Sequence, residues 1–527
     1  MSVAFSSKAS TLLALKSVLK SAKIAPLIVV TLDEWRASRE ACIENVTDSL
    51  GLGPLIVRSS SFLEDTQDSS NAGVFLSKLD VSIEQLPTSI DQVFDSYREC
   101  NQKDEVLIQP MLTNVLRSGV VFSHDPNTCA PYRIVNWSEG HDTSVVTGGI
   151  GGRVWQQAAL SPIKPPAYLQ PVIKLLDELL ELFDHCPIDC EFAVTNEICG
   201  IERHEILWLL QARPLILGSD SESESDQAMR LQIIENKLER GMQPHPFLMG
   251  SKTLYGVMPD WNPAEIIGIR PKPLSLSLYR ELVTDSIWAY QRHNYGYRNL
   301  RSFPLMPHFF GLPYVDVRLS LNSFIPNDLE DALANRLVDY YMNRLREEPE
   351  LHDKIEFEIV FSCYTFDLPD QLDSLRAFGF SKKETDRLTS SLRSLTNRIL
   401  HRTEGLWHLD AAKLDVLNSR RDSLLDSNTD SLARIYWLLE DAKRYGTLPF
   451  AGLARAGFIA VQLLKSLVSI GLFSGTDYEN FLASVSSVTG HLTRDRSVLD
   501  QSDFLAKYGH LRPGTYNIGS NLSVNGL

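Results

Sequence analysis

The stretch at residues 57–77, VRSSSFLEDTQDSSNAGVFLS, combines residue types that can bind phosphate. Arg58 offers a planar fork of hydrogen-bond donors that matches a phosphate group. Glu64 and Asp65 follow it within a run of small hydroxyl side chains. Residues 65–73 have mostly short side chains and favour turns. Backbone amides there can therefore approach an anion closely. Taken alone, the stretch is equally compatible with an ordinary polar loop.

A carboxylate and an amide occur in two later segments, DCEF at 189–192 and LLQARP at 209–214. Both segments read as strands, and if they pair, Glu191 and Gln211 share one face of the sheet. Their oxygen atoms are hard ligands of the kind that Mg²⁺ prefers. Arg213 points the same way as Gln211, towards phosphates that such a metal would bridge. For any one of these residues, the alternative is a surface ion pair.

Three further residues extend this pattern. Lys8 lies at the start of a predicted helix in SSKASTLLAL, and by itself is most simply a solvated lysine. Gln109 ends a predicted strand, where it either bonds an adenine edge or a ribose or is an ordinary strand-end glutamine. Glu139 precedes a glycine-rich loop, TGGIGG at 147–152, which is weak evidence for nucleotide binding by itself.

The elements that must position these side chains alternate along residues 1–216. Apolar, β-branched runs predict strands at 26–31, 54–58 and 106–109, with another strand after Ser118-Gly119. Residues 190–195 and 207–211 predict a strand pair. Helical spacing of apolar residues covers 11–19 and 172–183. These patterns predict an α+β domain with much sheet.

The next segment, LGSDSESESDQ at 217–227, alternates serine with acids and predicts a linker rather than a long loop within one domain. Residues 228–527 are predicted to form a second, mostly helical domain that binds the substrate. Helical periodicity covers the ranges 328–346, 382–398, 429–445, 450–472 and 477–488. Ahead of them, residues 314–320 alternate as a strand does.

The bulk composition is that of a globular protein of about three domains. The formal net charge of −15 argues against nucleic acid as a partner. The seven cysteines are scattered, and the spacing around Cys186, Cys190 and Cys199 favours reduced thiols over a zinc site. Lysines interrupt the N-terminal apolar run, and the apolar stretch at 456–473 is too short to be a convincing membrane span. We therefore expect a cytoplasmic protein with no membrane partner.

Read in order, these segments resemble the ATP-grasp nucleotide-binding domain of the phosphoenolpyruvate synthase and pyruvate phosphate dikinase family. That family shows VRSS…ED…S.AG, then Q.M….SGV.F..DP, then D.E.A and LQ.RP. The resemblance implies that Lys8, Arg58 and Arg213 contact ATP phosphates and that Glu191 and Gln211 hold Mg²⁺. It also implies that Gln109 and Glu139 lie near the nucleotide. The string EGHDTSVVTGG after Glu139 departs from the family's EG.GE.VVSG.

In this family, a histidine on a separate swivelling domain accepts a pyrophosphoryl group from ATP and passes a phosphoryl group to the substrate. None of the twelve histidines has the glycine-rich Thr-Ser-His context of that carrier, and Ser123-His124 lies inside the F..DP segment. We therefore expect the swivelling phosphohistidine domain to be absent from this chain. It would belong to a longer version of the chain or to a partner acting in trans.

The C-terminal half carries DWNPAEIIG, YVDVRLSLNSF and KYGHLRPGTYNIG, which resemble the substrate domains of rifampicin phosphotransferases and L-glutamine kinase. WNPAE and GHLRPGTY favour the glutamine kinase type. The resemblance implies an ATP-dependent phosphotransferase that phosphorylates the amide of L-glutamine for capsular polysaccharide phosphoramidate biosynthesis. The alternatives are a rifampicin-type antibiotic phosphotransferase and a non-catalytic nucleotide-binding subunit.

Five residues of this half are candidate substrate contacts. Two arginines can hold a carboxylate in bidentate fashion or make structural ion pairs, and a histidine is either a base or a structural residue. The candidates are Arg318, Asn322, His510, Arg512 and Tyr516.

Overall fold

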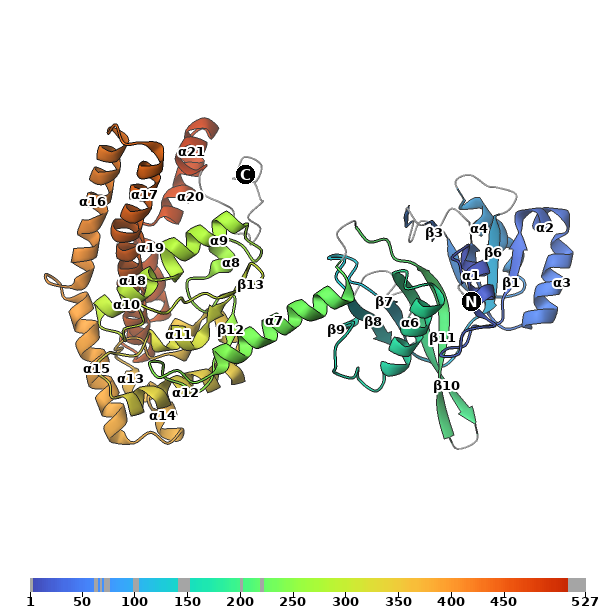
Figure 1. Cartoon of the computed structure of the whole chain (residues 1–527), viewed down its shortest axis with the longest axis horizontal. Coiled ribbons are helices and arrows are strands. Elements are labelled where there is room, and N and C mark those ends of the chain that lie inside the picture. The colour runs from blue at the N-terminus through green and yellow to red at the C-terminus, as the bar shows by residue number, and fades with distance from the viewer. Residues whose placement is uncertain are drawn as a thin grey trace. The chain divides into compact units, whose positions relative to one another are not determined.

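The computed structural model describes residues 3–60, 65–66, 69–70, 76–97, 104–140, 152–199, 202–218 and 222–509 (Figure 1). The chain divides into two compact units, Met1–Glu235 and Asn236–Leu527. The boundary falls within helix α7 (Glu224–Met242), which also contains the last residues of the predicted linker. Domain limits at 216 and 228 therefore stay predictions.

The first unit contains a four-stranded antiparallel sheet in the order β1-β6-β2-β5. Buried apolar residues of three helices, including Trp35, Val46 and Ile90, pack on one face of it. The strands are β1 (Ile28–Thr31), β6 (Glu105–Pro110), β2 (Leu55–Ser60) and β5 (Ser77–Val81), and the helices are α2 (Leu32–Ala37), α3 (Arg39–Leu50) and α4 (Leu86–Asp95). A two-stranded ribbon, β3 (Asp65–Thr66) and β4 (Ser69–Ser70), follows β2 in the chain.

A second antiparallel sheet of this unit has five strands in the order β11-β10-β7-β8-β9. Its strands are β11 (Glu202–Pro214), β10 (Ile188–Cys199), β7 (Val115–Phe122), β8 (Tyr132–Glu139) and β9 (Arg153–Ala158). Alternate residues of β10, such as Phe192 and Val194, join the core with helix α6 (Gln170–Leu182). The intervening residues of β10 must therefore face the other side of the sheet.

Helix α1 (Lys8–Leu15) connects the two sheets. Its buried residues Leu12 and Leu15 share one core with Leu107 of β6 and with Leu209 of β11. The backbone amide of Ala9 donates a hydrogen bond of 3.0 Å to the Ser60 hydroxyl on β2. The first turn of α1 is thereby held at the place where the two sheets meet.

The predicted start of the strand after Ser118-Gly119 is wrong. Strand β7 begins at Val115, so both residues lie inside it, and β6 and β7 belong to different sheets. Gly119 is required there because an added Cβ would clash with the carbonyl oxygen of Asn136 and lie 2.8 Å from the Trp137 Cα. Glycine at this position reflects close strand approach rather than a turn.

The second unit is mostly helical, so the predicted α+β class followed by a helical part is confirmed. Its core forms where α12 packs against α15, through residues such as Leu337 and Leu392. The α-helices are α8 (Pro263–Ile266), α9 (Pro273–Tyr279), α10 (Ile287–Tyr295), α11 (Val317–Asn322), α12 (Asp331–Glu347), α13 (Leu368–Gln371), α14 (Asp373–Ala377), α15 (Lys382–Leu400), α16 (Leu406–Leu425), α17 (Ser431–Asp441), α18 (Leu448–Ser469), α19 (Gly475–Ser484), α20 (Val488–Val498) and α21 (Gln501–Tyr508). The other helical segments are η1 (Arg280–Thr284), η2 (Pro349–Asp353), η3 (Ile355–Ile359) and η4 (Ala442–Thr447).

Two short strand pairs complete the unit, β12 (Tyr255–Gly256) with β15 (Val315–Asp316) and β13 (His308–Phe309) with β14 (Leu312–Pro313). The predicted strand at 314–320 is therefore wrong beyond residue 316. Helix α11 starts at Val317 because Asp316 caps it. The Asp316 carboxylate accepts a hydrogen bond of 3.2 Å from the backbone amide of Leu319.

The predicted helices at 429–445 and 450–472 form one continuous run, α17-η4-α18. Residues Ser431–Ser469 are long and apolar enough to cross a membrane by length and composition alone. The run also has an inward side, where Arg455, Ala456 and Ile459 are buried within the unit. Core helices of globular proteins pass the same test of length and composition, so the run is weak evidence for a membrane span.

Candidate nucleotide-binding site

Arg58 joins the two sheets of the first unit. Its Nη2 donates to Glu191 Oε2 at 2.9 Å, and its Nη1 lies 3.4 Å from the carbonyl oxygen of Leu210. Both side chains of this pair are about four-fifths shielded, with exposed fractions of 19% and 21%. Residues 133 positions apart in sequence thus form one ion pair between the two sheets.

The strand register explains why three polar side chains share a sheet face with Glu191. Glu191 lies opposite Gln211, and Asp189 lies opposite Arg213, with a bulge only after Glu191. Arg213 Nε donates to both oxygens of Asp189, at 2.6 and 2.9 Å. The predicted pairing of the strands is observed, and the structure brings Glu191, Gln211 and Arg213 to the face opposite α6.

The surroundings of Glu191 favour its ionised form. Burial acts to raise the pKa of this carboxyl group, but the positive charges of Arg58, then Lys8 and Arg213, outweigh it. The net result is a pKa below the ordinary value for glutamate. Three cations therefore converge on one carboxylate, and an added polyphosphate would compete with that carboxylate for them.

A network that the sequence did not reveal positions Lys8. Ser7 caps α1 by accepting the Ser10 amide at 3.3 Å, and its hydroxyl donates to Glu105 Oε2 at 2.8 Å. The Ser60 hydroxyl lies 3.4 Å from the same carboxylate oxygen. Glu105, at the start of β6, therefore fixes the first turn of α1 against β2.

Two predicted nucleotide contacts lie at different distances from this cluster. Gln109 is buried in β6 opposite Ile56, two residues from the position facing Arg58. Glu139 ends β8 and lies opposite Arg117 on β7. Glu191 lies opposite Val120 on the same strand. Arg117 and Val120 are three residues apart, which corresponds to roughly 10 Å along β7. The Glu139 carboxylate is exposed and pairs with Arg153 at 3.0 Å. The structure does not bring Glu139 into the cluster.

Several predicted site residues lie outside the residues that the structure describes. These are Glu64, His510, Arg512 and Tyr516, together with most of the loop from His141 to the glycine-rich string. Asp65 is described only as part of strand β3. The roles assigned to these residues stay predictions.

Arg318 and Asn322 are engaged by the protein's own backbone. Arg318 donates to the carbonyl oxygens of Gly241 and Gln243 at 2.8 and 3.0 Å, at the C-terminal end of α7. Asn322 is fully buried and bonds Met249 through both its oxygen and its nitrogen, at 2.9 Å each. This geometry favours structural roles for the two residues over contacts with a substrate carboxylate. Arg318 takes its role through carbonyl oxygens rather than through the structural ion pair considered above.

The side-chain oxygens of Glu191 and Gln211 are of the kind that Mg²⁺ prefers. Glu191 offers an ionised carboxylate, and Gln211 offers an amide directly across the strand pair. Mg²⁺ commonly takes one or two protein oxygens and completes its shell with water and phosphates. Among the described residues, no cluster of three or more His, Cys, Asp or Glu side chains has metal-binding geometry. Five cysteines are free thiols, namely Cys42, Cys129, Cys186, Cys190 and Cys363.

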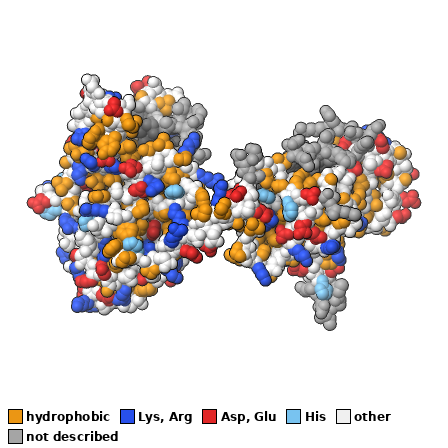
Figure 2. Space-filling model, in the orientation of Figure 1, with side chains coloured by type: hydrophobic (Ala, Val, Ile, Leu, Met, Phe, Trp, Pro, Cys, Tyr) orange, Lys and Arg blue, Asp and Glu red, His pale blue; other side chains and the backbone are white. Residues whose placement is uncertain are grey.

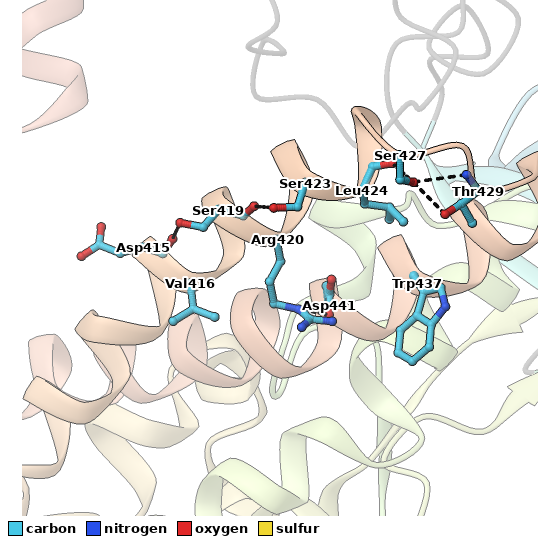
Figure 3. Close-up of a pocket in the computed structure, with 10 residues that line it drawn as sticks. All are labelled: Asp415, Val416, Ser419, Arg420, Ser423, Leu424, Ser427, Thr429, Trp437 and Asp441. Atoms are coloured by element: carbon cyan, nitrogen blue, oxygen red, sulfur yellow. Dashed lines mark hydrogen bonds and ion pairs between the residues drawn. The ribbon is translucent and has the colours of Figure 1, made fainter.

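A cavity of about 610 Å³ lies elsewhere, within the second unit. Side chains from α16 and α17 line it, among them Arg420, Asp441 and Trp437 (Figure 3). Arg420 Nε donates to Asp441 at 2.8 Å, and the serine hydroxyls of α16 bond to carbonyl oxygens of their own helix.

On the face shown in Figure 2, acidic and basic side chains are interspersed rather than gathered into one basic patch.

Residues 14–157 match the profile of the family described as pyruvate phosphate dikinase, AMP/ATP-binding domain. This part of the chain is therefore similar to the ATP-binding domain of that family. The match includes Arg58, Gln109 and Glu139 and ends before Glu191, Gln211 and Arg213. The strand pairing and the Arg58–Glu191 contact described above bring these three residues to Arg58. No curated protein matches the chain.

Solved structures with some likeness include D-alanine-D-alanine ligase from Helicobacter pylori, at 18% identity and a TM-score of 0.24. The alignment covers 40% of this chain and 54% of the ligase. The ligase from Coxiella burnetii gives 12% identity, coverage of 44% and 57%, and a TM-score of 0.24. This chain thus spans about half the length of these enzymes. With TM-scores this low, the likenesses support no conclusion about this chain.

Proposed function

We propose that this chain is the ATP-binding and substrate-binding part of an ATP-dependent phosphotransferase of the phosphoenolpyruvate synthase and pyruvate phosphate dikinase type. The observation that carries the proposal is the charge cluster around Glu191. This carboxylate pairs with Arg58, and the charges of Lys8 and Arg213 also lower its pKa. Of these residues, Arg58 lies inside the segment that matches the ATP-binding domain, at residues 14–157. Convergent cations of this kind stabilise the charge that develops during phosphoryl transfer.

In the proposed reaction, Arg58, Lys8 and Arg213 hold and orient the phosphates of ATP. A carrier histidine, supplied from outside the described residues, attacks the β-phosphorus, and the bond to AMP breaks. Water then releases inorganic phosphate from the pyrophosphorylated histidine, which leaves a phosphohistidine to donate to the substrate. Glu191 and Gln211 would hold Mg²⁺, which neutralises phosphate charge when bound.

For the acceptor, we propose the side-chain amide of L-glutamine, which gives a phosphoramidate for capsular polysaccharide. The support is the resemblance of WNPAE and GHLRPGTY to the glutamine kinase type. One observation keeps the antibiotic alternative open, because the cavity of about 610 Å³ beside Trp437 has the size of a site for a larger ligand.

The test is phosphorus NMR of the chain with ATP, Mg²⁺, a separately expressed carrier domain and L-glutamine. The proposal expects AMP, inorganic phosphate and a phosphoramidate signal to form together. Phosphoryl transfer to rifampicin but not to glutamine would instead support the antibiotic alternative. ATP binding without any AMP, even with the carrier domain present, would identify a non-catalytic nucleotide-binding subunit.

A further inference from the structure

A smaller cavity of about 220 Å³ in the second unit has an unusual polar lining. It lies between residues 360–367, which connect η3 to α13, and the C-terminal half of α18. Its charged lining residues are Glu358, Asp367 and Lys465. Drug-sized ligands occupy pockets of roughly 300–1,000 Å³, so this cavity suits a smaller molecule.

Two polar side-chain atoms at this cavity lack a partner within the described part of the chain. They are the hydroxyl of Thr365 and the Oδ1 of Asp367. Thr365 is 6% exposed, so its hydroxyl is not satisfied by open solvent. Buried polar groups are normally hydrogen-bonded, and two exceptions around one cavity indicate a bound polar molecule.

The backbone of the same segment is firmly bonded, so the unpaired side chains are not a sign of a loose loop. The amides of Phe361, Tyr364 and Phe366 donate to the hydroxyls of Tyr341, Thr396 and Ser466, at 3.3, 2.9 and 3.2 Å. The segment is therefore anchored to three different helices. The larger cavity at α16 differs, because its serine hydroxyls are already bonded to their own helix.

The charges of the smaller cavity come from separate elements. Asp367 directly precedes α13, whereas Lys465 lies on α18, and no ion pair of either is found among the described residues. The Lys465 ammonium lies 5.8 Å from the Phe357 ring centre, in cation–π range. A ligand carrying one ammonium and one carboxylate group can satisfy both residues.

Cys363 also lines the cavity, but its chemistry points to binding rather than catalysis. Burial raises the pKa of this thiol to about 12, so it stays protonated. Its Sγ lies 3.0 Å from Gln462 Oε1, and the Gln462 amide donates to the Glu356 carbonyl at 3.1 Å. These two side chains therefore form a fixed wall.

We infer that this cavity binds a small zwitterion of the free amino-acid class, with its ammonium group at Asp367 and its carboxylate at Lys465. The hydroxyl of Thr365 bonds a polar side chain of the ligand, such as an amide or a hydroxyl. The choice of glutamine as one ligand rests on the proposed function, whereas the cavity and its charges do not. Binding requires neither ATP nor a carrier histidine, so a failed titration and a failed phosphoryl transfer are separate results.

The experiment is calorimetric titration of the full chain, without nucleotide, with L-glutamine, L-asparagine and L-serine. The controls are two analogues of glutamine, 4-carbamoylbutanoate without the ammonium group and 4-aminobutanamide without the carboxylate. We expect saturable binding of at least one amino acid. For glutamine, each analogue should bind at least about tenfold more weakly, the effect of losing one charge-assisted hydrogen bond. Absence of saturable binding of all three amino acids, or equal affinity for an analogue, overturns the inference.

Variants locate the site. Asp367→Asn and Lys465→Gln should each raise the dissociation constant at least about tenfold. Matched controls are Asp386→Asn and Lys383→Gln, which change exposed residues on α15 and should leave the constant unchanged. Lys465 is exposed, so Lys465→Gln tests the site even if the Asp367 variant fails to fold. Unchanged affinity in the Lys465 variant overturns the placement of the ligand here.

Discussion

At the scale of single residues, the candidate nucleotide site depends on charges that neutralise one another until a nucleotide arrives. Arg58 forms an ion pair with Glu191, and Arg213 forms one with Asp189. The two guanidinium groups that we propose bind phosphate are therefore paired with carboxylates of the protein. The sequence predicted Arg58, Glu191, Gln211 and Arg213 because their types match phosphate and magnesium chemistry. It could not predict Asp189 as a partner of Arg213, since that pairing depends on the strand register.

The first prediction concerns Arg58→Ala. We expect ATP to bind at least about tenfold more weakly, because one charge-assisted contact is lost. The free energy of unfolding should also fall by about 1–3 kcal/mol, since Glu191 loses its partner. Fluorescence titration with ATP and urea unfolding measure the two effects.

The control for this variant is Arg39→Ala. Arg39 pairs with Asp91 on the surface of the same unit, with an exposed fraction of 58%. Its loss should change stability by less than about 1 kcal/mol and leave ATP affinity unaltered. If the two variants behave alike, Arg58 is an ordinary ion-pair residue.

The second prediction concerns the pH dependence contributed by Glu191. Its pKa in the folded protein lies below the ordinary value of 4.5, so its ionised form stabilises the fold. That contribution is fully present above the unfolded pKa and is lost as the pH falls through the folded pKa. The stability difference between the wild type and Glu191→Gln should therefore shrink as the pH drops from neutral to about 3. Urea midpoints across this range measure it, and a difference that stays constant with pH would exclude the proposed charge cluster.

At the scale of elements, the sequence predicted those strands whose apolar residues are continuous or alternate, including β1, β2, β6 and β10. It misplaced the start of β7, because Ser118-Gly119 resembles a turn when the neighbouring strand is unknown. It also took residues 317–320 for strand, although a side-chain cap on Asp316 starts a helix there. In both places a tertiary or capping contact outweighs the local pattern.

The third prediction tests the close approach of β7 and β8 with Gly119→Ala. The added methyl group would clash with the backbone of Asn136 and Trp137, so the strands must shift. We expect a loss of about 1–3 kcal/mol in the free energy of unfolding. The control is Gly53→Ala, where an added Cβ meets nothing within 4 Å. Equal stability of the two variants in urea would show that the strands accommodate the methyl group.

The fourth prediction separates the structural and substrate readings of Arg318. Because its guanidinium bonds two carbonyl groups at the end of α7, Arg318→Ala should destabilise the second unit by about 1–3 kcal/mol. Arg346→Ala, at an exposed position on α12, is the control and should cost little. A stable Arg318→Ala protein with a raised KM for the phosphoryl acceptor would instead restore the substrate contact.

At the scale of the whole molecule, the division into two compact units sets what a ligand can stabilise. ATP is expected to bind within Met1–Glu235, whereas the smaller polar cavity lies within Asn236–Leu527. The sequence predicted this order, a sheet-rich part followed by a helical part, from the change of periodicity. It did not predict that the boundary would fall inside one helix, because the serine-rich acidic string is typical of a linker.

The fifth prediction is that magnesium-ATP stabilises the first unit selectively. At a free concentration of one hundred times the dissociation constant, the gain should be about 2.7 kcal/mol. Hydrogen exchange measured by mass spectrometry should slow in β2, β10 and β11 and stay unchanged in α12 and α15. Slower exchange throughout both units would contradict a site confined to the first.

The distance in sequence between Arg58 and Glu191 has a consequence for folding. The pair closes a loop of more than a hundred residues, and contacts between such remote segments form late because much chain entropy must first be lost. We therefore expect nucleotide-binding competence to form late in the assembly of the first unit. During refolding, ATP-binding competence should appear after the secondary structure, which makes the nucleotide a reporter of completed folding.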